Sequence, residues 1–203
     1  MDKKEQILEK ATRLFAEKGY AGTSVRDLAA DVGINIAMVN YYFGSKEKLF
    51  MEVVAYRTAY LKGVFTGIAN DTSLTAFQKI EEVIKSLMNR MFDNPSFHHL
   101  IHRELSLDER PELHKHIVDI LLANAAIIKK ILAEGIRKGE FEKVDTELTV
   151  TTLIGSLSQL LVSNLLTKTF VNSKNDTLHA DKKFRKRVTD HLIFLMRRFL
   201  IKN

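Results

Sequence analysis

Apolar residues recur every three or four positions along most of this 203-residue chain, and this spacing predicts an all-helical protein. The first apolar face spans residues 7 to 15, and Gly19 follows it as a helix stop. After Ser45 the same spacing continues to residue 68 without a helix breaker, which predicts one long helix. Only two prolines and nine glycines interrupt the chain, which favours long helices over a fold with many turns.

Five further helices are expected from the same spacing. They should cover residues 74–92, 97–107, 112–138, 145–168 and 182–201, which makes about nine helices in all. Within the fourth of these, residues 153–166 are apolar nearly all round, but serines, Gln159 and Asn164 interrupt the run. A membrane span needs about 20 apolar residues, so this stretch predicts a helix buried on most sides instead.

The segment TSVRDLAADVGINIAMVNYYFGSKEKLF, residues 23–50, predicts two short helices joined by a tight turn. Ser24 is the expected N-cap of the first, with Asp27 placed to reach back to the free amides. Gly33 supplies the left-handed residue that ends this helix, and Asn35 caps a second helix of about two turns. Two short helices with a Gly-containing turn form a helix-turn-helix, whose second helix enters the major groove of DNA.

Four groups of residues between positions 5 and 50 carry a family resemblance. They are Gly19-Tyr20, the run TSVRDLA at 23–29, Gly33, and the run NYYFGSKEKLF at 40–50. In motif, spacing and distance from the N-terminus they resemble the DNA-binding domain of the TetR family. The resemblance implies a helix-turn-helix DNA-binding domain at residues 1–46. It also implies a larger helical domain at 47–203 that binds an effector and dimerises.

Position by position, the resemblance implies which side chains meet DNA. The expected contacts are Ser24, Arg26, Asn35, Ile36, Ala37, Met38, Tyr41, Tyr42 and Lys46. Tyr42 and Lys46 are expected on phosphates, whereas apolar Ala37 and Met38 can contact thymine methyl groups in the groove. The alternative is that the tyrosines belong to the core and the lysine is solvated. Arg26 is either a phosphate contact or a solvated side chain.

The last two long helices are the expected dimer interface, because the family usually pairs them in a four-helix bundle. The interface residues would be Leu153, Leu157, Leu161, Val188, Leu192 and Met196.

An apolar effector pocket is a further expectation, since Met and Phe side chains adapt to varied ligands. The candidate lining is Met88, Met91, Phe92, Phe97, His102 and Glu104. The plainer interpretation of such a stripe is ordinary core. His98 and His102 share a helix face, and His114 and His116 follow, but no further ligand has the spacing of a zinc site, so no metal is expected.

Composition narrows the functional classes. The chain has no cysteine, which excludes disulfides and thiolate catalysis, and we find no nucleophile–base pair or phosphate-binding loop. The net charge of +6 lies mostly in residues 172–203, away from the helix-turn-helix, so the motif rather than the charge indicates DNA binding. The basic run 182–187 is either a solvated helix face or a surface for nucleic acid or anionic lipid.

The sequence therefore predicts a cytoplasmic, homodimeric regulator that binds double-stranded DNA at a palindromic operator. A small-molecule effector bound by the C-terminal domain would release it, so it would act as a repressor. Neither enzymatic activity nor a cofactor is expected. The alternatives are a helical adaptor that binds protein, or a small helical enzyme that keeps the helix-turn-helix scaffold.

Overall fold

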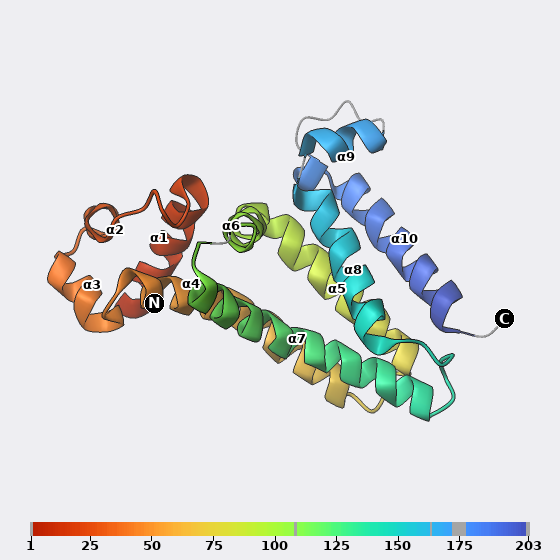
Figure 1. The fold of residues 1–203 in the computed structure, drawn as a ribbon. Coiled ribbons are helices and arrows are strands. Elements are labelled where there is room, and N and C mark those ends of the chain that lie inside the picture. Colours follow the sequence, from red (N-terminus) through yellow and green to blue (C-terminus); the bar gives the residue numbers. More distant parts are fainter. Residues whose placement is uncertain (1, 108, 163, 172–177, 202–203) are drawn as a thin grey trace. The chain divides into compact units, whose positions relative to one another are not determined.

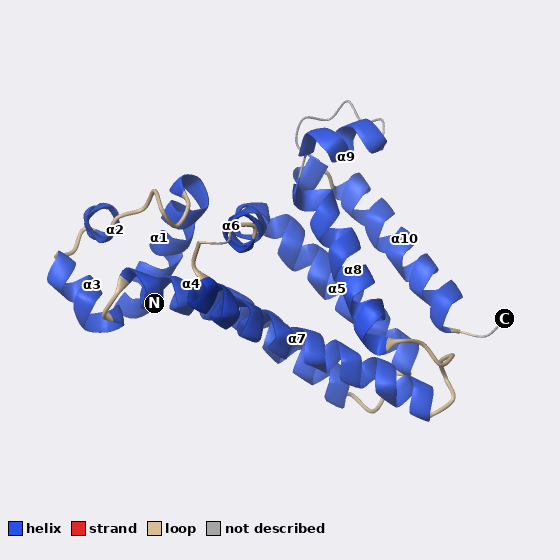
Figure 2. Cartoon of the chain, in the orientation of Figure 1, coloured by secondary structure: helices blue, strands red, loops and turns tan. Residues whose placement is uncertain are grey.

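The computed structural model describes residues 2–107, 109–162, 164–171 and 178–201, and those residues contain helices and loops but no strand (Figures 1 and 2). The elements are α1 (Lys3–Lys18), α2 (Val25–Val32), α3 (Ile36–Phe43), α4 (Lys46–Asn70), α5 (Ala76–Asp93), α6 (Pro95–Leu105), α7 (Pro111–Arg137), α8 (Thr146–Val162), α9 (Asn164–Phe170), the 3₁₀ helix η1 (Leu178–Ala180) and α10 (Lys182–Leu200). The all-helical prediction is confirmed.

The helix signals in the first 50 residues act as predicted. The Ser24 hydroxyl accepts a 3.0 Å hydrogen bond from the Asp27 amide, and the Asp27 carboxylate accepts one of 3.1 Å from the Ser24 amide. These bonds hold the pKa of the Asp27 carboxyl below its usual value. Gly33 ends α2 in the left-handed region at φ 73°, and the Asn35 side chain accepts from the amide of Ala37 at 3.0 Å.

The predicted single helix over residues 145–168 is wrong. The chain forms α8 and then α9, so the described residues contain ten α-helices rather than nine. The hydroxyl of Thr167 donates a 3.1 Å hydrogen bond to the carbonyl of Leu160, seven positions earlier. Seven residues of continuous α-helix rise by about 10 Å, so this bond is not compatible with one straight helix through α8 and α9.

The chain divides into two compact units. Unit 1 contains residues 1–60 and 96–121, and unit 2 contains residues 61–95 and 122–203. The expected boundary after residue 46 does not coincide with this division, because α4 begins within the core of unit 1, where Phe50 and Val53 have no exposed surface.

The core of unit 1 is built around aromatic rings from distant positions. Phe15 and Phe50 meet edge to face with centroids 5.0 Å apart, and Tyr20 meets Phe50 at 5.1 Å. Leu28 of α2 and Val39 of α3 join the same cluster, so the first three helices share one hydrophobic core. This packing holds the helix-turn-helix as a rigid unit.

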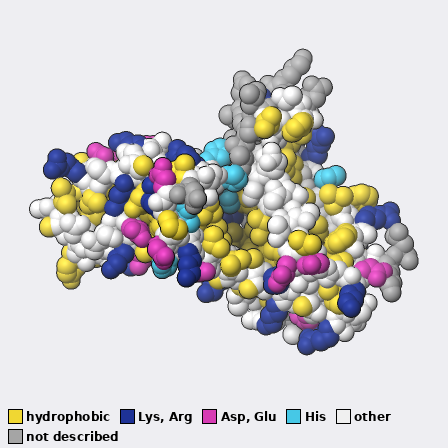
Figure 3. Space-filling view, in the orientation of Figure 1, with side chains coloured by type: hydrophobic (Ala, Val, Ile, Leu, Met, Phe, Trp, Pro, Cys, Tyr) yellow, Lys and Arg dark blue, Asp and Glu magenta, His cyan; other side chains and the backbone are white. Residues whose placement is uncertain are grey.

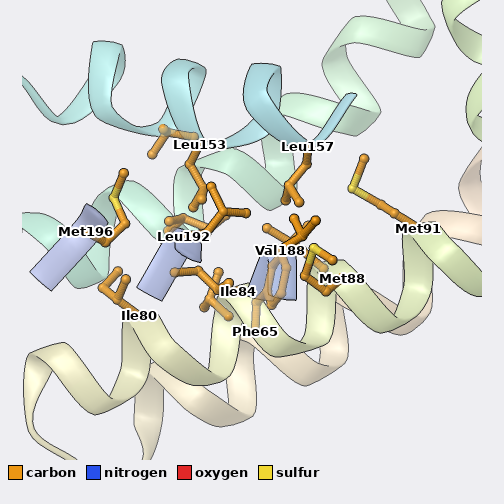
Figure 4. Close-up of a cluster of buried hydrophobic side chains, with 14 of the residues drawn as sticks. Phe65, Ile80, Ile84, Met88, Met91, Leu153, Leu157, Val188, Leu192 and Met196 are labelled. Carbon is orange, nitrogen blue, oxygen red and sulfur yellow. The ribbon is translucent and has the colours of Figure 1, made fainter. Parts of the chain in front are cut away.

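The core of unit 2 gathers side chains from α4, α5, α7, α8 and α10, with Ile128, Ile131 and Leu132 from α7. Figure 4 shows those from the other four helices pointing toward one another: Phe65 from α4, Ile80, Ile84 and Met88 from α5, Leu153 and Leu157 from α8, and Val188, Leu192 and Met196 from α10. Among the described residues, no helix is both long and apolar enough to cross a membrane.

Neighbouring side chains leave no room for a side chain at Gly135, near the end of α7. A Cβ added there would overlap the ring of Phe141 and lie 2.9 Å from the Cβ of Ala76. We expect Gly135→Ala to destabilise the protein by about 1–3 kcal/mol through overpacking, although alanine favours helix. Gly63→Ala in α4 is the matched control, because a Cβ there meets nothing within 4 Å.

Gly63→Ala should leave stability unchanged or raise it by about 0.5–1 kcal/mol, since alanine loses less backbone entropy on folding. Chemical denaturation of both variants measures the difference. Equal stabilities of the two variants would show that the space around residue 135 opens at little cost.

Candidate DNA-binding surface

The helix α3 presents one face to the core and the other to solvent. Val39 and Phe43 are buried in the core of unit 1. Tyr41 is the most exposed large apolar side chain of the helix, with 85% of its surface accessible, and Met38 is also exposed. Since two adjacent aromatics cannot both be buried on so short a helix, the prediction that one ring faces outward is confirmed.

The nine predicted DNA contacts fall into an exposed group and a partly buried group. Ser24, Arg26, Asn35, Ala37, Met38 and Tyr41 are exposed, whereas Ile36, Tyr42 and Lys46 are partly buried. The rings of Tyr41 and Tyr42 meet edge to face with centroids 5.5 Å apart, so the exposed Tyr41 ring packs against the partly buried Tyr42 ring. All nine lie on α2, on α3, at their N-caps or at the first residue of α4.

Lys46 opens α4, where the free amide groups of the first turn lie. The Ser45 hydroxyl accepts a 3.1 Å hydrogen bond from the amide of Lys48, which satisfies one of these donors. The ammonium of Lys46 lies 4.3 Å from the centroid of the Tyr20 ring. Burial lowers the pKa of this ammonium, and the nearby guanidinium of Arg110 adds to the shift. A helix N-terminus beside a lysine is a favourable setting for a phosphate.

Ion pairs that the sequence pattern did not indicate hold the helices of the unit together. Arg13 of α1 donates to both carboxylate oxygens of Asp31 in α2, at 3.0 and 3.1 Å. Glu9 of α1 accepts a 3.0 Å hydrogen bond from the Tyr56 hydroxyl and pairs with Arg57, both on α4. These contacts join residues 18 to 48 positions apart, and no local signal marks them.

Charge alone does not locate this surface. On the face drawn in Figure 3, Lys and Arg side chains are spread among acidic ones rather than gathered into one patch.

The six predicted pocket residues are divided between the two units. Met88, Met91 and Phe92 are buried in the core of unit 2, and Phe97 is buried in the core of unit 1. His102 is exposed. Glu104 is buried and pairs with Arg110. The plainer interpretation, that the Met and Phe stripe is ordinary core, therefore describes these side chains as they stand.

The histidines make local contacts. His114 lies 3.4 Å from a carboxylate oxygen of Glu104, and a ring nitrogen of His116 bonds the carbonyl of Glu112 at 2.7 Å. Among the side chains that the structure describes, no group of three or more His, Asp or Glu residues is arranged to hold a metal ion.

Two parts of the chain match families of known proteins. Residues 7–53 match the bacterial regulatory proteins of the tetR family, and residues 73–161 match the tetracyclin repressor-like C-terminal domain. The first match covers the helix-turn-helix with its outward face on α3. The chain belongs to the TetR family of transcriptional regulators. The predicted family and its helix-turn-helix are thereby confirmed.

Other bacterial transcriptional regulators share parts of this sequence. The HTH-type transcriptional regulator YttP of Bacillus subtilis is 26% identical over 140 residues, which cover 68% of this chain and 67% of YttP. IcaR of Staphylococcus aureus, an HTH-type negative transcriptional regulator of the biofilm operon icaADBC, is 31% identical over 90 residues. That match spans 44% of this chain and less than half of IcaR, at 46%.

Solved structures share the whole fold. FadR from Bacillus subtilis, determined in complex with stearoyl-CoA, superposes with a TM-score of 0.75 at 22% identity and covers 95% of this chain and 96% of its own. The fatty acid degradation regulator FadR from Bacillus halodurans gives 0.76 at 21% identity, with 95% of both chains covered. At these identities the likeness concerns the fold.

Proposed function

We propose that this TetR-family protein is a homodimeric repressor that binds a palindromic operator and leaves it when a small molecule binds the C-terminal domain. The observation that carries the proposal is the outward face of α3, where exposed Met38 and Tyr41 project from a helix anchored by Val39 and Phe43. A regulator of this kind acts on the chromosome, so we place it in the cytoplasm.

DNA recognition would divide between two kinds of contact. Ala37 and Met38 would lie in the major groove, where apolar side chains contact thymine methyl groups. Tyr41, Tyr42 and Lys46 would hold phosphates at the edges of the groove, and the first turn of α4 would contribute its free amides. Ser24 and Asn35 already cap their helices, so their side chains would meet DNA only beside those bonds.

The dimer interface is proposed on different side chains from those first expected. The six predicted residues are buried within the chain itself and have little surface left for a partner. The opposite faces of the same helices are open: α10 exposes Phe194, Leu195 and Phe199, and α8 exposes small side chains around Gly155. The rings of Phe194 and Phe199 from one subunit would pack against the small side chains around Gly155 in the other. The two helices of each subunit would then form a four-helix bundle.

The effector would act by shifting the populations of two conformations of the dimer. A ligand that binds better to one spacing of the two DNA-reading heads moves the dimer toward that spacing. The negative regulator IcaR supports repression, and FadR with its bound stearoyl-CoA supports a small-molecule effector in this fold. We propose the same arrangement here, with the effector bound within the segment 73–161.

Sequencing the genomic DNA that the purified protein retains tests the proposal directly. We expect an enriched palindrome with half-sites about 34–36 Å apart on one face of the duplex, or one turn further if the heads are splayed. Retention of no specific DNA would exclude the operator-binding function.

Lys46→Ala provides the first mutational test. Because a phosphate contact carries no base information, the variant should bind specific and random DNA more weakly alike, with the salt slope reduced by about one per subunit. Met38→Ala should instead change the preferred sequence, since Met38 is placed to meet base edges. Fluorescence anisotropy at several salt concentrations measures both. Wild-type affinity in Lys46→Ala and in Tyr42→Ala would show that the DNA-binding surface is misassigned.

A further inference from the structure

The C-terminal family segment reaches into the DNA-binding unit. Residues 96–121 lie within the segment 73–161 but belong to the same compact unit as the helix-turn-helix. Apolar side chains of this segment, among them Leu100 and Leu113, join the hydrophobic core of the N-terminal helices. Beside that core, charged side chains of the segment gather near one ring, that of Tyr20. We call Tyr20, Lys46, Glu104 and Arg110 the Tyr20 cluster.

Tyr20 is held in place by the core beneath it. Its ring stacks on Phe15 with centroids 6.0 Å apart and meets Phe50 edge to face at 5.1 Å. Two cations lie against this one ring. The Lys46 ammonium is 4.3 Å from its centroid, and the central guanidinium carbon of Arg110 is 5.0 Å from it. The two positive charges are therefore within about 10 Å of each other, which is comparable to the Debye length of about 8–10 Å at 0.1–0.15 M salt.

A buried carboxylate accompanies the two cations. Glu104 is only 3% exposed and accepts two hydrogen bonds from Arg110, one of 2.8 Å from Nε and one of 3.2 Å from Nη2. This two-point geometry is the strong form of a carboxylate–guanidinium pair. A buried carboxylate left without its cation is unfavourable and takes the nearest positive charge available.

Lys46 is a cation that the carboxylate can influence. The charge of Glu104 raises the pKa of the Lys46 ammonium, while burial and the charge of Arg110 lower it more strongly. The hydrogen bonds to Glu104 raise the pKa of Arg110. The guanidinium therefore binds the carboxylate and repels the ammonium, and both effects favour Lys46 beside the Tyr20 ring over an ion pair with Glu104.

We propose that Arg110 is a positioning residue for DNA binding, which keeps Glu104 from capturing Lys46 so that the lysine stays available to a DNA phosphate. This inference rests on the proposed function, since it assigns a purpose to the phosphate contact of Lys46. It places a determinant of DNA affinity, Arg110, outside the helix-turn-helix. Arg110 itself need not touch DNA.

The test removes Arg110 and then removes the carboxylate. Arg110→Met keeps the apolar stem but removes the guanidinium from Glu104, which keeps the His114 ring 3.4 Å from one oxygen. Lys46 should therefore turn inward. DNA affinity should fall on the order of tenfold, and the salt slope should fall by about one per subunit, as for loss of a phosphate contact. In a Lys46→Ala background the same substitution should cost nothing further, because the contact is already lost.

Rescue separates positioning from a structural role. The double variant Glu104→Gln/Arg110→Met has no carboxylate to attract Lys46, so its DNA affinity and salt slope should return to those of the wild type. Glu104→Gln alone should also keep wild-type affinity, and it remains informative if Arg110→Met does not fold. Lys115→Met, which removes an exposed positive charge from the helix α7 that follows Arg110, is the control for general electrostatic attraction. Thermal melting of each variant establishes that it is folded.

Three results would overturn the inference. They are unchanged or tighter binding by folded Arg110→Met, an equal loss in the Lys46→Ala background, and no recovery in the double variant. Each of these leaves the proposed function intact if the wild type still selects its palindrome. Failure of the wild type to bind any operator would instead remove the proposed function itself.

Discussion

Phe194→Asp should convert the dimer to a monomer and with it abolish operator binding at nanomolar concentrations. Phe194 lies on the outer face of α10 with 53% of its surface exposed in the single chain. In a twofold interface each substitution occurs twice, and losing a central aromatic costs about 2 kcal/mol or more per copy. Association should therefore weaken by about a thousandfold. Sedimentation velocity measures the oligomeric state, and anisotropy measures the DNA affinity.

The control for this variant is Leu122→Asp on α7, which adds the same charge at a side chain that is 57% exposed. It should remain a dimer and bind DNA as the wild type does. A dimeric Phe194→Asp protein would place the interface on another surface. A wild type that is monomeric at micromolar concentration would remove the dimer from the proposal altogether.

Leu157→Asp should have a different and larger effect, namely unfolding of unit 2. Leu157 has no exposed surface and packs in the core with α5 and α10 (Figure 4). A charge there has no partner, and the lost apolar contacts add to its cost, so we expect destabilisation by more than about 4 kcal/mol. Leu157→Ala should cost about 2–5 kcal/mol.

Urea denaturation followed by circular dichroism measures both Leu157 variants, and Leu122→Asp again serves as the control, within about 0.5 kcal/mol of the wild type. A Leu157→Asp protein that is folded but monomeric would mean that this side chain faces a partner, as the sequence first suggested. The results for Phe194→Asp and Leu157→Asp together thus show whether the dimer interface lies on the outer face of α10 or on the face that contains Leu157.

Local signals identified the helix-turn-helix because their physical effects are local. Ser24, Asp27, Gly33 and Asn35 cap or stop helices through bonds that span two to four residues. The apolar period likewise located α4, α5, α7 and α10 to within a few residues. The break between α8 and α9 escaped, because the bond from Thr167 to Leu160 has no counterpart in the helical period.

The apolar period could not decide which neighbour a stripe packs against. Val188, Leu192 and Met196 share a face of α10, as predicted, but they cover their own chain's α5 rather than a second subunit. An intrachain core and an interchain interface present the same spacing of apolar residues. Only the packed fold shows which of the two faces of α10 is already covered.

By itself, the sequence determined the all-helical class, the helix-turn-helix with its caps, and the family, because each depends on residue types at short fixed spacings. The tertiary structure decided what those spacings cannot express. It returned residues 96–121 to the DNA-binding unit, joined Glu104 to Arg110 and Arg110 to Tyr20, and turned the predicted interface leucines inward. The physical reason is that burial and ion pairing depend on residues far apart in the chain, whose approach is set by the packing of whole helices.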